Sequence, residues 1–162
     1  MSNTKTIEFL QKAVAMELTA AHQYQLHAHV LEDWGLSKLA VQMRAEMQEE
    51  LGHLDAFMER IMFLKGTPEL AFGKPPKRAA TLVDMFKSDL ADEEEAIACY
   101  TSAAQHANEI GDIGTRTLFE KIVLDEEGHK SWLELQLGLI ERLGEKTYSA
   151  KFMTTGGDGE PA

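Results

Sequence analysis

The sequence contains a single cysteine, which excludes an intrachain disulfide bond and any metal centre built from several thiolates. Proline is also scarce, and three of the 4 prolines lie between residues 68 and 76. Long segments on either side are therefore free of the residue that most strongly breaks helices. No apolar run approaches the roughly 20 residues of a membrane-spanning helix, and Lys5 and Glu8 interrupt the apolar core that a secretory signal would need. We expect a cytoplasmic protein with no membrane partner.

Positive charge is in deficit as well. The chain has 16 lysines and arginines against 27 aspartates and glutamates, and its formal net charge is -11. Such a chain is repelled by nucleic-acid backbones and anionic membranes, and it attracts cations. A solvated acidic surface would explain the same charge, so net charge excludes nucleic acid as a partner without establishing a cation site.

Apolar residues recur at helical spacing in four long segments, which a chain of 162 residues can bury as one domain. The predicted helices span residues 4–33, 38–65, 82–110 and 115–143. Ser37 and Thr81 are predicted N-caps, and Gly144 is predicted to end the fourth helix. A short helix at 145–152 would complete a domain of residues 1–152, and residues 153–162 read as a flexible tail.

The lengths of the connections predict the topology. Short breaks follow the first and third helices, so each makes an antiparallel hairpin with its successor. Residues 66–80 are long enough to run the length of the bundle, at roughly 3.3 Å for each extended residue. The sequence therefore predicts an all-α four-helix bundle in which the second and third helices are parallel and joined by one long crossover.

Each predicted helix carries ionisable residues in the middle of its apolar stripe. These are Glu17 in the first helix, Glu50 and His53 in the second, Glu93 in the third, and Glu126 and His129 in the fourth. An unpaired carboxylate in a core costs several kcal/mol, and no lysine or arginine lies on the central part of any stripe. A bound metal is the natural remaining source of positive charge.

An internal repeat strengthens this interpretation. The motif Glu50-x-x-His53 recurs as Glu126-x-x-His129, and in each half another glutamate lies 33 residues before the motif, at Glu17 and Glu93. The two halves are offset by 76 residues throughout. A single Glu-x-x-His is common by chance, whereas two at a shared offset, each with a matching inward glutamate, are a specific signal.

The spacing has a chemical reason. Residues three apart share a helix face, so one helix can give a carboxylate and an imidazole to one site. Four glutamates balance the charge of two divalent cations, and this mixture of oxygen and nitrogen donors suits iron or manganese better than structural zinc. Glu50 and Glu126 would bridge the ions. Glu17 with His53, and Glu93 with His129, would be terminal ligands, leaving room for O2 or hydrogen peroxide.

At these residues the chain resembles the bacterioferritins, over residues 4–152. Besides the ligand motifs, the resemblance rests on Asp33-Trp34-Gly35-Leu36, on residues 59–64, and on Asp125-Glu126-Glu127-Gly128-His129. The resemblance implies a ferritin-like fold, ferroxidase activity that oxidises Fe(II) to Fe(III) at the di-iron centre, and iron storage as ferric mineral. It also implies a hollow shell of twenty-four subunits.

Two positions depart from the family pattern. Leu51 stands where the family has the methionine that binds haem between paired subunits, and Ala45 stands where some members have a histidine that serves an iron site on the inner surface. We therefore expect this chain alone to form no stable haem site. Any haem in the shell would come from co-assembled, haem-binding paralogue subunits.

Tyr24 and Tyr100 each follow a ligand glutamate by seven residues and so share its helix face. We expect buried tyrosines bonded to carboxylates, and the resemblance suggests that Tyr24 also donates an electron. Glu46 and Glu49 could guide iron toward the site. His27 lacks a partner pattern and is interpreted as a surface or interface residue.

Two other functions remain open. A ferritin-like di-iron oxidase or peroxidase of the erythrin type would use the same ligands without storing iron, although one cysteine cannot build the rubredoxin-type centre that erythrins often carry. A bundle used only for protein interaction would have no need of the buried ligands.

Overall fold

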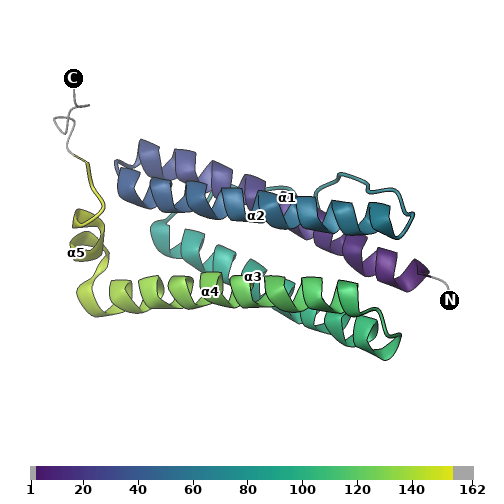
Figure 1. Cartoon of the computed structure of the whole chain (residues 1–162). Coiled ribbons are helices and arrows are strands. Elements are labelled where there is room, and N and C mark those ends of the chain that lie inside the picture. The colour runs from purple at the N-terminus through teal and green to yellow at the C-terminus, as the bar shows by residue number, and fades with distance from the viewer. Residues whose placement is uncertain (1–2, 155–162) are drawn as a thin grey trace, which may run out of the picture.

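The computed structural model describes residues 3–154, and within that range it contains helices and no strands. The helices are α1 (Thr4–Asp33), α2 (Ser37–Phe63), α3 (Leu82–Glu109), α4 (Ile113–Leu143) and the short α5 (Glu145–Ala150). Figure 1 shows the first four as a long bundle, with α5 at the end where α4 stops. The predicted all-α fold with a short C-terminal fifth helix is confirmed.

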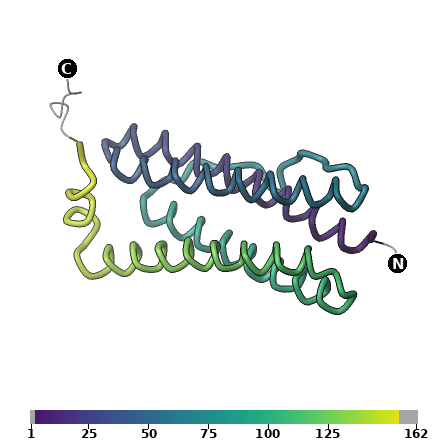
Figure 2. The backbone as a smooth tube through the Cα atoms, in the orientation of Figure 1, coloured from purple at the N-terminus to yellow at the C-terminus, as the bar shows by residue number. Residues whose placement is uncertain are grey.

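The bundle consists of two antiparallel hairpins. Helix α1 packs most extensively against α2, and α3 against α4, while the contacts between the hairpins are fewer. The crossover, residues 64–81, runs back along the bundle, so α2 and α3 point the same way and α1 and α3 point in opposite directions (Figure 2). This arrangement matches the predicted topology.

The helix ends show which local predictions were right. The Thr81 hydroxyl accepts a hydrogen bond from the backbone N–H of Asp84, so Thr81 is the N-cap of α3 as predicted. Gly144 ends α4 with a φ of 74°, a conformation that glycine adopts without steric cost. The prediction for Ser37 was wrong, because α2 begins at Ser37 itself and the Ser37 hydroxyl lies 2.9 Å from that of Thr154.

Buried apolar side chains form two clusters, one toward each end of the bundle. One cluster includes Leu31, Met43, Phe86 and Leu133, and the other includes Leu10, Phe57, Ile61, Tyr100 and Phe119. The ionisable residues of the helix stripes lie between them. The fold therefore encloses a polar middle between two apolar ends, as the stripes predicted.

The crossover is fastened to α1. The backbone N–H of Gly73 donates to the carbonyl of Ala15 at 3.2 Å. The side-chain amide of Gln23 both donates to and accepts from the backbone of Lys77, at 2.8 Å in each direction. These bonds fix the loop beside the middle of the bundle, where the ionisable residues lie.

No helix in the described range is long and apolar enough to cross a membrane. Of the predicted tail, residues 153–162, only Met153 and Thr154 are described, and the N–H of Thr154 donates to the carbonyl of Gly35 at 3.2 Å. Residues 155–162 lie outside the described residues.

Candidate metal centre

The six residues that the sequence singled out come together in the middle of the bundle, one or two from each of α1 to α4. All are buried, with between 1% and 7% of each residue exposed. Their possible ligand atoms form two sets, and the atoms within each set lie within 4.8 Å of one another. The sets are Glu17, Glu50, His53 and Glu126, and Glu50, Glu93, Glu126 and His129. Glu50 and Glu126 belong to both, so the two sets could hold two neighbouring cations that share these carboxylates.

The first set centres on the Nδ1 atom of His53. This nitrogen lies 2.9 Å from Glu126 Oε1 and 3.5 Å from Glu17 Oε2. In the second set, His129 Nδ1 lies 3.0 Å from Glu50 Oε1 and 3.5 Å from Glu93 Oε1. Each contact in the first set thus has a counterpart in the second set between the residues that correspond in the internal repeat.

Several of these atoms have no hydrogen bond despite their close contacts. Among the described residues, Glu17 Oε2, Glu50 Oε1, Glu126 Oε1 and the Nδ1 atoms of His53 and His129 are buried without a hydrogen-bond partner. Buried polar atoms are ordinarily paired. Lone pairs of carboxylate oxygens and imidazole nitrogens that face a common space fit metal cations, so the donor set suits two divalent ions.

Protons take part in the charge balance of the metal-free site. Burial opposes the charged form of His53, but its contacts with Glu126 and Glu17 outweigh this effect and raise the pKa of His53 to about 10. The surrounding glutamates likewise raise the pKa of His129 well above its ordinary value against the effect of burial. Burial, followed by contact with Glu126, raises the pKa of Glu93 to about 8. The site therefore holds protons that a metal cation would displace.

The far nitrogen of each imidazole contacts an additional carboxylate. Asp125 Oδ2 lies 3.0 Å from His53 Nε2, in a hydrogen bond between α4 and α2. His129 Nε2 lies 2.7 Å from Glu46 and 3.1 Å from Glu49. Such outer carboxylates orient a ligand imidazole. Helical periodicity does not select Asp125, because this residue is off the inward stripe and its partner is 72 residues away.

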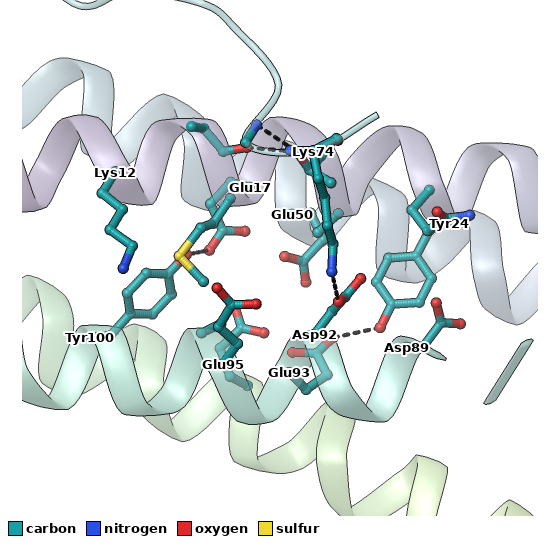
Figure 3. Close-up of a pocket in the computed structure, with 18 residues that line it drawn as sticks. Lys12, Glu17, Tyr24, Glu50, Lys74, Asp89, Asp92, Glu93, Glu95 and Tyr100 are labelled. Carbon is teal, nitrogen blue, oxygen red and sulfur yellow. Dashed lines mark hydrogen bonds and ion pairs between the residues drawn. The ribbon is translucent and has the colours of Figure 1, made fainter. Parts of the chain in front are cut away.

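Both tyrosines are bonded to carboxylates, as predicted, but each bond crosses between the hairpins. The Tyr24 hydroxyl on α1 donates to Glu93 on α3, and the Tyr100 hydroxyl on α3 donates to Glu17 on α1 (Figure 3). Burial and the charges of these partners raise the pKa of both phenols well above the ordinary value of a tyrosine. Both hydroxyls are therefore hydrogen-bond donors at neutral pH.

The interpretation of His27 as a surface or interface residue was wrong. His27 is 1% exposed, and its Nδ1 atom lies 3.0 Å from Asp89 Oδ2 while its Nε2 atom lies 2.8 Å from the amide nitrogen of Gln23. Burial raises the pKa of Asp89 to about 6, against the opposing effect of His27. The pair was missed because Asp89 is 62 residues away in the sequence.

A cavity of about 310 Å³ extends between α1 and α3 to the candidate site. Glu17, Glu50, Glu93 and Glu126 all line this cavity. Toward the solvent, Lys74 of the crossover forms an ion pair with Asp92 of α3, and Figure 3 shows this pair between the two tyrosines. The cavity gives a small cation or an oxidant space to reach the buried carboxylates.

Comparison with known proteins identifies chains related to this one. Residues 7–143 match the model of the ferritin-like domain. A bacterioferritin from Rhodobacter capsulatus is 41% identical over 91% of each chain, and one from Brucella melitensis is 38% identical over 89% of each chain.

Solved structures show the same relationship. The bacterioferritin of Rhodobacter capsulatus superposes with a TM-score of 0.94 at 38% identity, covering 98% of this chain and 99% of that one. That structure has a metal-free dinuclear site and a haem iron in a crystallographic special position. A bacterioferritin of Mycobacterium tuberculosis superposes with a TM-score of 0.91 at 34% identity, covering 95% of this chain and 97% of that one. The chain belongs to the bacterioferritins, within the family of proteins that share the ferritin-like domain.

Proposed function

We propose that this chain is an iron-storage subunit that oxidises Fe(II) to Fe(III) at the site between its four long helices. The observation that carries the proposal is the pair of overlapping ligand sets that share Glu50 and Glu126. Two ions held this close can give up two electrons in one encounter with an oxidant. Membership of the bacterioferritin family supports storage as the purpose of that reaction.

Each residue has a role in this scheme. Glu50 and Glu126 bridge the two Fe(II) substrates because they belong to both sets, while the other four residues are terminal ligands. Those terminal ligands are Glu17 with His53, and Glu93 with His129. Four carboxylates offset the charge of two Fe(II) ions. Two Fe(III) ions would leave two positive charges unbalanced by these carboxylates, and oxide or hydroxide derived from water would offset them.

The electron balance defines what the oxidant does. Two Fe(II) ions reduce hydrogen peroxide with two protons to two waters, or reduce O2 with two protons to hydrogen peroxide. Reduction of O2 to two waters needs four electrons: two from the bound Fe(II) pair, one with its proton from the phenol of Tyr24, and one from a further Fe(II) substrate ion. We therefore assign Tyr24 a catalytic role, supported by its hydrogen bond to Glu93.

Membership of the bacterioferritin family and several exposed apolar side chains support assembly into a shell. Val41, Phe63, Leu124 and Leu135 are between 58% and 68% exposed and are candidates for contacts between subunits. We propose that such side chains are covered in a shell of twenty-four copies, with or without haem-binding paralogue subunits, and that the ferric product is stored inside.

The erythrin-type alternative differs in what becomes of the iron. Aerobic addition of Fe(II) to the purified protein, followed by size-exclusion chromatography and iron analysis, separates the two functions. We expect one large particle that retains many more than two irons per subunit. A monomer or dimer that oxidises Fe(II) and retains no more than two irons would favour the alternative, and slow oxidation at the uncatalysed rate would exclude both.

A further inference from the structure

Each buried tyrosine of the site reaches the glutamate of the opposite hairpin. Glu17 and Tyr24 are seven residues apart on α1, and Glu93 and Tyr100 are seven apart on α3. Because these helices run in opposite directions, each phenol lies level with the other helix's glutamate (Figure 3). The resulting bonds, Tyr24 to Glu93 and Tyr100 to Glu17, form a reciprocal pair across the cavity.

The bond from Tyr100 determines which oxygen of Glu17 is available. Tyr100 donates to Oε1. The other oxygen, Oε2, is buried without a hydrogen-bond partner among the described residues, and it lies 3.5 Å from His53 Nδ1. A carboxylate fixed through one oxygen cannot rotate freely about its terminal bond, so the second oxygen stays directed toward the first ligand set.

The ring of Tyr100 is itself held rigidly. Its centroid lies 5.4 Å from that of Phe57 and 5.6 Å from that of Phe119, and Tyr100 is 0% exposed. Aromatic contacts at these separations favour defined ring orientations. Both tyrosines line the same cavity, but only Tyr100 has its ring packed between two phenylalanines. The phenol of Tyr100 is thus a donor whose ring is held by apolar contacts.

We propose that Tyr100 is a positioning residue for the cation bound by Glu17 and His53. We propose further that Tyr24, besides the electron transfer proposed for it above, positions Glu93 for the cation bound by Glu93 and His129. The inference rests on the two-cation site of the proposed function. It goes further by assigning one phenol to each cation. The two crossed bonds also join α1 directly to α3 at the site.

The test uses Co(II) as the probe, which binds without being oxidised. In Tyr100→Phe, we expect one of the two Co(II) ions to bind about tenfold or more weakly, the lower end of what loss of an outer hydrogen bond costs. Anomalous diffraction from Co(II)-loaded crystals should show reduced occupancy beside Glu17 and His53 only. Tyr24→Phe should show the reverse pattern.

Tyr148→Phe is the matched control, because it removes another buried hydroxyl, one that donates to Gln136 at 2.8 Å and belongs to the apolar cluster at the α5 end. It should leave both Co(II) ions in place. Equal losses at both positions in Tyr100→Phe, or full occupancy in a variant that is merely less heat-stable, would overturn the positioning role. Failure of the unmodified protein to bind two Co(II) ions would instead overturn the proposed function.

Discussion

His53 on α2 and Glu126 on α4 approach to 2.9 Å, although the two residues belong to different hairpins. Glu126 thus contacts the imidazole of the opposite half as well as its own partner, His129, at 3.4 Å. The site therefore exists only when the hairpins are packed. The buried carboxylates repel each other in the metal-free chain, so packing energy from the two apolar clusters holds a site that favours a cation.

The first prediction concerns the shared ligands. Glu50→Gln keeps the volume of the side chain but removes a charge from both ligand sets. We expect the initial rate of Fe(II) oxidation, measured by stopped-flow absorbance, to fall by more than the roughly 100-fold that loss of an outer-sphere partner can cost. The metal-free protein should unfold at a similar temperature, because burial and the neighbouring Glu17 raise the pKa of Glu50 well above its usual range and so already reduce the charge that the substitution removes.

Glu127→Gln is the control for this prediction. Glu127 is the exposed neighbour of Glu126, and its substitution removes one negative charge, as Glu50→Gln does. Its oxidation rate should stay within about twofold of the unmodified protein. An unchanged rate in Glu50→Gln would contradict the assignment of a shared ligand.

Much of this site could be predicted from the sequence, because a helix places its residues by a local rule. Glu50 and His53 share a face wherever their helix lies, and the 76-residue repeat identified their counterparts. The hydrogen bonds from Tyr24 and Tyr100 to glutamates of the opposite hairpin could be predicted only once the direction of α1 relative to α3 was known.

Contacts that depend on packing between distant segments could not be derived in this way. The buried pair of His27 with Asp89 and the ion pair of Lys74 with Asp92 carry no periodic signal, because each joins two elements whose relative position only the fold defines. The cap predicted at Ser37 was wrong for a similar reason. The Ser37 hydroxyl lies beside the hydroxyl of Thr154, which is distant in the sequence.

The second prediction concerns protons released on metal binding. His53, with a pKa of about 10, and Glu93, with a pKa of about 8, both hold protons at pH 7 in the metal-free chain. A metal ion must displace these protons, so affinity should fall as the pH is lowered and rise as it is raised. We expect Co(II) affinity to change about tenfold for each pH unit if one proton leaves per ion.

Calorimetry in buffers with different ionisation enthalpies measures this release directly. At pH 7 the apparent binding enthalpy should vary linearly with the ionisation enthalpy of the buffer. The slope of that line, which is the number of protons released, should exceed one for each pair of Co(II) ions. Binding enthalpies that are the same in all buffers would show that the ligands are already deprotonated.

The third prediction concerns access through the cavity. Lys74 is 56% exposed at its side chain, so its ion pair with Asp92 contributes under about 1 kcal/mol to stability. Its charge nevertheless repels cations near the cavity. Lys74→Gln should therefore leave the unfolding temperature nearly unchanged and accelerate Co(II) binding severalfold at low salt, with less effect at high salt.

Stopped-flow absorbance at two ionic strengths tests this expectation. Lys87→Gln is the control, because Lys87 is also exposed on the surface of the bundle but does not line the cavity. Equal acceleration in both variants would indicate a general effect of net charge. No acceleration in either would exclude Lys74 as a barrier.

The last prediction concerns haem. Leu51 is partly buried beside the apolar cluster of Leu54 and Phe57, and it has no sulfur to bind iron. Met47, one helical turn of about 5.4 Å earlier, is also partly buried, and its thioether could replace the missing ligand only if the haem shifted by that distance. We therefore expect the shell of this chain alone to bind no stoichiometric haem.

Reconstitution with haem followed by visible spectra of the reduced protein tests this expectation, and Leu51→Met is the decisive variant. Because leucine and methionine have similar volumes, the substitution should cost under about 1.5 kcal/mol in packing. The variant should gain the low-spin spectrum of iron bound by two methionines, one from each of two paired subunits. The same spectrum from the unmodified chain would show that another residue binds haem. Its absence from a correctly assembled Leu51→Met shell would mean that the surface around residue 51 has diverged as well, so that loss of the haem site involved more than one substitution.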